Sequence, residues 1–152
     1  MNLKIVNRKI DGKGFSLIEL IIVVTIMGVL IAVLAPQYIR YIEKSRVGKD
    51  TEVAGVVRQA INVAMADPSI KDRPMMFSQA PIENIDNGTM PDFASAVKEY
   101  LGTSSLGTFR KERVTSKTYA DQDILVEINA SAELVEVTIK SNYSGIDDIV
   151  IR

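Results

Sequence analysis

One acidic residue, Glu19, lies near the start of a long apolar run. Residues 15–35 carry no other charge. A carboxylate in a membrane-spanning segment costs about 2.5–3.5 kcal/mol near the bilayer centre and less near an interface. An ionisable residue in such a segment therefore indicates a function and needs a partner. A cut before Phe15 would supply one, because the new α-amino group has a reference pKa of about 7.7–8.0 and carries positive charge.

The spacing of these two residues predicts which chains would pair. Glu19 follows Phe15 by four residues, about one helical turn. In a neighbouring chain staggered along the helix axis, the amine of Phe15 could lie beside this carboxylate. Opposite charges attract strongly at low dielectric, and an unpaired buried charge is heavily penalised. The pattern thus predicts helices assembled side by side in one register.

The element that must position this pair is a membrane-length helix. Residues 15–35 would span roughly 31 Å at about 1.5 Å per residue, the thickness of a bilayer core. The preceding segment, residues 1–14, is polar and basic, with a side-chain charge of +3 from Lys4, Arg8, Lys9, Lys13 and Asp11. This charge predicts that the N-terminus stays in the cytoplasm and that the rest of the chain lies outside.

Three other interpretations of the apolar run explain less. A buried helix of a soluble domain would leave no solvated face on a segment this apolar. A conventional cleaved signal peptide has an apolar stretch of about 7–15 residues, shorter than this one. A plain single-span anchor explains the length and the basic flank, but it gives no reason for Glu19.

Composition restricts the chemistry of the remaining chain. The sequence has no cysteine and no histidine, which removes disulfides, the usual general base and the common zinc ligands. A net charge of −1 argues against strong nucleic-acid binding. Calcium needs six to eight oxygens, so two short acidic pairs, Asp121 with Asp123 and Asp147 with Asp148, are interpreted as solvated turns. We predict no enzyme, no cofactor and no metal site.

Hydrophobic periodicity predicts an α+β fold in the rest of the chain. The helix should resume after Pro36 and end near Ala66. Its apolar stripe for a head domain is predicted at Val53, Val57, Ala60, Ile61 and Ala64. The charged residues of this half are expected mostly on solvated faces: Glu43, Lys44, Arg46, Lys49, Asp50 and Arg58. Residues 70–88 are expected to form a loop whose segment 75–77 tucks under a sheet, with a binding patch as the alternative for that segment. Residues 91–101 should form a short helix that begins at Pro91 and ends before Gly102.

The C-terminal third predicts an antiparallel sheet. Apolar and polar residues alternate over 124–129 and 135–140, with a turn between these segments. Residues 149–151 can add a strand, and residues 113–119 are another candidate. Short links between consecutive strands favour antiparallel pairing, and the sheet should pack on the stripe of the long helix.

The N-terminal pattern resembles the class III signal of type IV pilins. The resemblance rests on Gly14-Phe15-Ser16-Leu17-Ile18-Glu19 followed by an apolar run to Ala32. It implies that prepilin peptidase cuts between Gly14 and Phe15 and that the Phe15 amine is methylated. Glu19 aligns with the assembly glutamate of the family, Gly28 with a glycine in the stretch that can melt on assembly, and Pro36 with the proline that interrupts the first helix. Physics agrees, because glycine and proline both weaken a helix. Close helix–helix packing, in which a small residue lets two backbones approach, explains Gly28 equally well.

The same resemblance implies three parts of the chain: a leader (1–14), a transmembrane and filament-core half of the first helix (15–36), and a globular head (37–152) in the ladle-like pilin fold. The mature chain would have 152 − 14 = 138 residues and a net charge of −1 − 3 = −4. Many pilins of diderm bacteria close a C-terminal loop with a disulfide. The absence of cysteine therefore makes this chain look more like a pilin of a Gram-positive bacterium such as a clostridium.

The implied function is that of a structural pilus subunit. Such a subunit sits in the cytoplasmic membrane and then polymerises with its own kind into an extracellular filament for motility, adhesion or biofilm formation. Its partners would be prepilin peptidase and the assembly platform with its ATPase. The first alternative is a pseudopilin of a secretion or DNA-uptake machine, which shares the signal. The second is a membrane-anchored sensor or enzyme domain, in which Glu19 would be dispensable.

Overall fold

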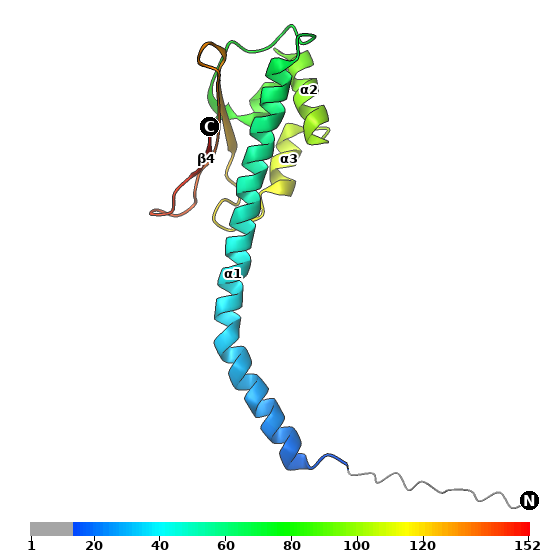
Figure 1. Ribbon diagram of the computed structural model, residues 1–152, viewed down its shortest axis with the longest axis vertical. Coiled ribbons are helices and arrows are strands. Elements are labelled where there is room, and N and C mark those ends of the chain that lie inside the picture. The colour runs from blue at the N-terminus through cyan, green and yellow to red at the C-terminus, as the bar shows by residue number, and fades with distance from the viewer. Residues whose placement is uncertain (1–13) are drawn as a thin grey trace, which may run out of the picture. The chain divides into compact units, whose positions relative to one another are not determined.

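A computed structural model describes residues 14–152 of the chain (Figure 1). The predicted leader lies outside this range except for Gly14. The chain divides into two units between Arg40 and Tyr41. The elements, in order, are α1 (Leu17–Ala66), β1 (Met76–Pro81), η1 (Ile82–Asp86), α2 (Pro91–Leu101), α3 (Leu106–Arg113), β2 (Ile124–Asn129), η2 (Ala130–Ala132), β3 (Leu134–Ile139) and β4 (Ile149–Ile151).

The first part of α1 is apolar on every side and uncovered. Its large hydrophobic side chains, from Leu17 to Leu34, are 48–75% exposed. Among the described residues, α1 is the one helix long and apolar enough to cross a membrane. A helix that is apolar all round must be covered by lipid or by other protein.

Pro36 does not interrupt α1, which differs from the expectation. The helix runs unbroken from Leu17 to Ala66 with Pro36 inside it. Proline lacks an N–H, so the carbonyl of Ala32 loses its usual helical donor, and one missing bond leaves the flanking turns helical. Gly28 also lies within the helix, and a Cβ added there would meet no atom within 4 Å. A weakened stretch between these residues stays a prediction.

The second part of α1 supplies one wall of the head core. Its buried residues alternate spacings of four and three at Asp50, Ala54, Val57, Ile61 and Ala64. This spacing places them on one helix face. The apolar ones pack with α2, α3 and the sheet in a single hydrophobic cluster. The predicted stripe is confirmed, although Val53 at its edge is only half-buried.

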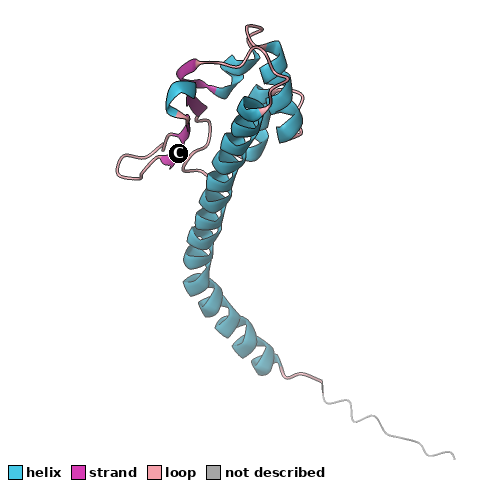
Figure 2. Ribbon diagram, turned by 45° about the horizontal axis from the view of Figure 1, so that its top comes forward, coloured by secondary structure: helices cyan, strands magenta, loops and turns pink. Residues whose placement is uncertain are grey.

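The sheet has four antiparallel strands in the order β1-β2-β3-β4. The predicted hairpin forms from β2 and β3, with Val126 opposite Val137, and its alternate residues Ile124, Val126 and Ile128 are buried. At the turn, the side chain of Asn129 accepts a hydrogen bond from the backbone N–H of Ala132 at 3.2 Å. Figures 1 and 2 show the strands on one side of the head part of α1 and the helices α2 and α3 on the other.

The short helix α2 has the predicted bounds and ends. Pro91 occupies its first turn, and Gly102 closes it in the left-handed conformation at φ 64°. Glycine adopts this conformation without a Cβ clash, which explains its place at the helix end. Phe93, Val97 and Leu101 are buried, as their four-residue spacing predicted.

The sequence interpretation was wrong in two segments. The expected loop at 70–88 contains β1 and η1, because β1 pairs with β2 despite a bulge between Phe77 and Ala80. Met75 and Met76 are 70% and 78% exposed, so they do not lie under the sheet, whereas Phe77 is half-buried and packs against the core as expected. The candidate strand at 113–119 is absent from the described structure: α3 ends at Arg113, and turns follow. The cause is a set of hydrogen bonds to α1, in which the carboxylates of Asp50 and Glu43 accept from backbone N–H groups of residues 115–118.

Candidate functional site

The N-terminal end of α1 is stabilised by the one acidic residue of the apolar run. The carboxylate of Glu19 accepts a hydrogen bond from the backbone N–H of Ser16, with N and Oε2 separated by 2.8 Å. Ser16 and Glu19 have the Ser-x-x-Glu spacing of a capping box, in which the acidic side chain satisfies a free donor at the helix start. A negative charge in the first turn also complements the helix dipole.

This local role was missed in the sequence analysis, which assigned Glu19 only a partner in another chain. The signal was present in the four residues Ser16-Leu17-Ile18-Glu19. Within one chain the carboxylate therefore has a hydrogen-bond donor at hand. A charge that lies near a membrane interface and accepts a hydrogen bond costs less than a bare one.

Gly14 and Phe15 precede the helix in an exposed segment. Helix α1 begins at Leu17, and the Phe15 side chain is 92% exposed. A Cβ on Gly14 would meet nothing within 4 Å, so no neighbouring atom covers this side of the Gly14–Phe15 bond. The bond predicted to be cut is therefore non-helical and uncovered, which suits access by a peptidase.

The apolar run contains one further polar side chain whose hydrogen bond is satisfied internally. The Thr25 hydroxyl donates to the carbonyl oxygen of Ile21 at 2.7 Å. In a membrane every polar group needs a partner within the protein, and this bond supplies one. Such a segment can be covered by lipid or by the apolar side chains of other helices.

A second polar cluster lies in the head, where Asp50 is completely buried. Its carboxylate accepts hydrogen bonds from the backbone N–H of Thr115 at 2.9 Å and of Ser116 at 3.1 Å, and from the Ser116 hydroxyl. Hydrogen bonds to a charged acceptor are stronger than those between neutral groups. Asp50 thus fixes the start of the segment 115–122 against α1.

Two more side chains hold the same segment. Glu43 accepts from the backbone N–H and the hydroxyl of Thr118, at 3.0 and 3.1 Å. From the other side, the Asn142 amide donates to the carbonyl oxygens of Ala120 at 2.8 Å and Lys117 at 3.3 Å. We call these contacts of Glu43, Asp50 and Asn142 the polar clasp. It ties the C-terminal loop to α1 without a disulfide.

The prediction that the charges of this half lie mostly on solvated faces was wrong for three of them. Glu43 and Asp50 bind the segment 115–122, and Arg58 donates to the carbonyl oxygen of Val135 at 3.2 Å. The usable signal was the spacing. Glu43 and Asp50 are seven residues apart and continue the buried four–three repeat of Val57 and Ile61. A polar residue on an apolar stripe indicates a buried partner.

Tyr119, at the centre of the clasped segment, is 3% exposed, and its hydroxyl donates to the carbonyl oxygen of Asp147 at 2.9 Å. Burial raises the pKa of Tyr119 above its ordinary value, and the negative charges of Asp148, Asp147 and Asp50 raise it further. Asp148 accepts from the backbone N–H of Ser141 at 2.8 Å. The acidic pair at 147–148 therefore belongs to the architecture of this loop.

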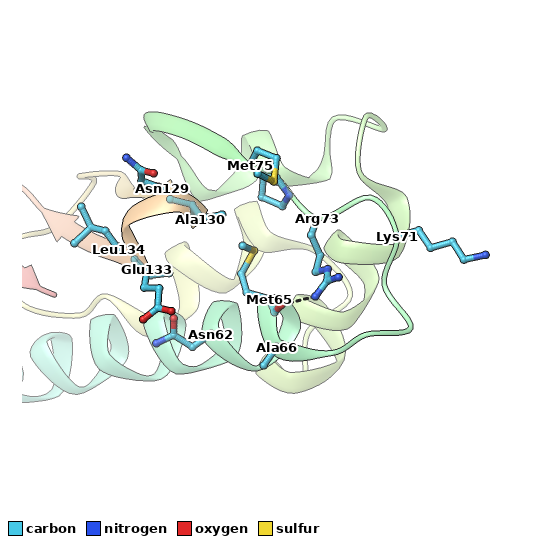
Figure 3. A pocket seen from close by; sticks show the side chains of 13 residues that line it. Asn62, Met65, Ala66, Lys71, Arg73, Met75, Asn129, Ala130, Glu133 and Leu134 are labelled. Atoms are coloured by element: carbon cyan, nitrogen blue, oxygen red, sulfur yellow. Dashed lines mark hydrogen bonds between the residues drawn. The ribbon is translucent and has the colours of Figure 1, made fainter.

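The described residues offer no cluster of three or more potential metal ligands. In the other acidic pair, Asp121 and Asp123, the carboxylate of Asp123 forms an ion pair with Nε of Arg110 at 3.5 Å. A cleft of about 730 Å³ lies between the end of α1 and the turn from β2 to β3 (Figure 3). At its wall Arg73 donates to the carbonyl oxygen of Met65 at 2.8 Å, which satisfies a free carbonyl near the helix end.

Comparison with known proteins extends this description. Residues 12–35 match the family model described as the prokaryotic N-terminal methylation motif. The chain is 47% identical over 55 residues to a type IV major fimbrial protein FimA of Dichelobacter nodosus, which is 36% of this chain and 35% of the relative. It is 33% identical over 101 residues to the type IV major alpha-pilin of Moraxella bovis, which is 66% of this chain and 53% of the relative. No solved structure matches the chain with comparable significance.

The exposed apolar helix lies in the segment that matches the methylation motif and is joined to an α+β head, a combination consistent with a pilin-like protein. The motif and the matches to major pilins support the assignment of this chain as a type IV pilin. The matched segment spans about a third of the length of the FimA relatives.

Proposed function

We propose that this chain is a structural subunit of a type IV pilus that polymerises through the first part of α1. One observation carries the proposal: a membrane-length apolar helix is exposed on every side and has one carboxylate, in its first turn. Exposed apolar area costs roughly 25 cal/mol per Å² in water, so this helix must stay covered. When it leaves the lipid, apolar protein surface must take the place of the lipid. Copies of the same helix offer that surface.

The proposed maturation is a cut between Gly14 and Phe15 followed by methylation of the new amine. The matched methylation motif and the uncovered, non-helical bond support it. The cut removes a side-chain charge of +3, which would otherwise hold the N-terminus in the cytoplasm. After the cut the subunit has a single-pass, N-in topology and can leave the membrane outward with its apolar helix.

We assign Glu19 two successive partners. Before assembly its carboxylate caps the helix by accepting from the N–H of Ser16. In the filament it pairs with the Phe15 amine of a neighbour, which adds Coulomb attraction in a low-dielectric bundle. Gly28 and Pro36 lower the helix stability between them, so this stretch is where α1 adjusts on assembly.

The decisive variants are Glu19→Gln and Glu19→Ala. Glutamine also serves as the third residue of a capping box, so Glu19→Gln keeps the local cap and removes only the charge. We expect cleaved, membrane-inserted protein and no filaments with either variant. Filaments of normal number built from Glu19→Gln alone would refute charge pairing.

Processing is tested by mass spectrometry of protein sheared from the cell surface. The expected species begins at methylated Phe15, and Gly14→Ala should retain the leader. A mature chain beginning elsewhere would contradict the cut. Imaging of the producing cells with an antibody to the head separates a pilus from the alternative. Long surface fibres are expected, whereas only short fibres confined to the envelope would indicate a pseudopilin.

A further inference from the structure

A projecting loop on one side of the head has an apolar and acidic tip. This loop, residues 140–148 between β3 and β4, exposes Tyr143 by 54% and Ile146 by 47%, with Asp147 and Asp148 beside them. Gly145 adopts a φ of 89°, and the Ile146 N–H donates to the carbonyl oxygen of Tyr143 at 3.3 Å, which closes the tip as a turn. The polar clasp holds its base, so the tip is presented by a fixed support.

A groove lies elsewhere on the head, between α1, α2 and α3. It has a volume of about 330 Å³ and is lined by Lys49, Glu52, Val53, Val56, Leu101, Phe109 and Arg113. Its floor is apolar, and Val56 is 39% exposed within it. The Arg113 guanidinium stacks over the Phe109 ring at 5.7 Å from the centroid. Two cations and one carboxylate line the groove, so its charge is +1.

The loop and the groove are complementary in chemistry and separated in space. The tip carries exposed apolar side chains and two carboxylates, and the groove has an apolar floor and two cations. Figures 1 and 2 show the loop on one side of the head part of α1 and the helices α2 and α3 on the other. One head therefore cannot fill its own groove with its own loop.

We propose that the 140–148 loop of one subunit docks in the α1–α2–α3 groove of a second copy of this chain. Ile146 enters beside Val56 and Phe109, while Asp147 and Asp148 face Lys49 and Arg113. A contact between two different faces is heterologous, so each copy still offers a free loop and a free groove, and the contact can be repeated from copy to copy. The inference rests on the proposed pilus function and names the head surfaces that join its subunits.

The absence of cysteine from the chain allows a direct test in filaments. In the variant carrying Ile146→Cys and Val56→Cys, a short bifunctional thiol crosslinker applied to sheared filaments should yield a ladder of covalent multimers. The matched control carries Ile146→Cys and Val63→Cys. Val63 is an exposed valine on the same side of α1, seven residues or about 10 Å from Val56 and outside the groove. We expect its ladder to be at least several-fold weaker.

Charge reversal provides the second measurement. Asp148 is left unchanged, because its carboxylate accepts a hydrogen bond from the backbone N–H of Ser141 within the loop. In the variant with Asp147→Lys, an attractive pair becomes repulsive, and we expect a severalfold loss of sheared filament, as the change at one exposed pair would produce. Adding Arg113→Glu should restore most of it. A thermal melt of each purified full-length variant in detergent checks that the head stays folded.

The outcomes separate the two proposals. Filaments that form normally but give equal ladders with Val56→Cys and Val63→Cys, or no rescue on double reversal, would overturn loop–groove docking and leave the pilus function standing. A wild-type chain that never forms filaments would instead refute the pilus function. A ladder specific to Val56→Cys together with rescue would support the docking.

Discussion

Replacing Asp50 with alanine should destabilise the head more than any exposed charge replacement. The carboxylate is completely buried and accepts from two backbone N–H groups and one hydroxyl. Its removal leaves three donors without their acceptor, and each unsatisfied buried group costs about 1–3 kcal/mol. The Ser116 hydroxyl can rotate to another acceptor and water can enter the space. We therefore expect a net loss of about 3–5 kcal/mol in the free energy of unfolding.

Urea unfolding of the full-length protein in detergent, followed by tyrosine fluorescence, measures this loss. With an m-value of about 2 kcal/mol/M, the midpoint should fall by roughly 2 M. Asp50→Asn should lose less stability than Asp50→Ala, because its amide oxygen still accepts a hydrogen bond. It should still be less stable than wild type, because its NH₂ group would face other donors. The matched control is Glu52→Ala, an exposed acidic residue two positions along the same helix, expected within about 0.5 kcal/mol of wild type. A loss below about 1 kcal/mol for Asp50→Ala would refute this account of the polar clasp.

Three further predictions concern the head. Burial raises the pKa of Tyr119 in the folded protein. The contribution of Tyr119 to stability is therefore complete below about pH 10 and is lost as the pH rises through the pKa of the folded state. The urea midpoint of wild type should exceed that of Tyr119→Phe by less above about pH 10 than below it. Gly102→Ala should lower the thermal midpoint by an amount equivalent to about 1 kcal/mol, since φ is 64° there; an unchanged midpoint contradicts this. Asn142→Ala should speed amide exchange at residues 117–122 with little change in α2; equal exchange contradicts this.

Local signals predicted the elements with regular patterns. Helix α2 had proline at its start, glycine after its end and apolar residues spaced by four, and its bounds agree with prediction. In the hairpin, β2 alternates between buried and half-buried residues over all six positions, and β3 alternates over its first four. In these segments each residue's preference agrees with the global fold, and short-range reasoning is then sufficient.

Tertiary contacts decided the segments that prediction missed. Strand β1 contains two polar residues and a proline, and it becomes a strand because β2 offers an open edge. The segment 115–122 is turn-like because Asp50 and Glu43, more than 60 residues earlier, accept its N–H groups. A partner so distant in sequence leaves no periodic signal in the segment itself.

The candidate site likewise has features that local sequence predicts and features that depend on other molecules. Glu19 and the Gly14–Phe15 bond could be identified from the sequence because charge and apolar length are local properties. The capping contact between Ser16 and Glu19 was equally local, and its four-residue pattern was overlooked. The cleavage, the methylation and the neighbour's amine involve other molecules, so they stay predictions.

The amide of Asn142 donates hydrogen bonds to the main-chain oxygens of residues 117 and 120, and every amino acid has a main-chain oxygen. The side chains at 117 and 121 are exposed and take no part in these hydrogen bonds. Substitution of Lys117 can therefore alter the outer surface of this loop without loss of the hydrogen bonds that close it, whereas Asp121, at a φ of 61°, restricts its position to residues that tolerate the left-handed conformation.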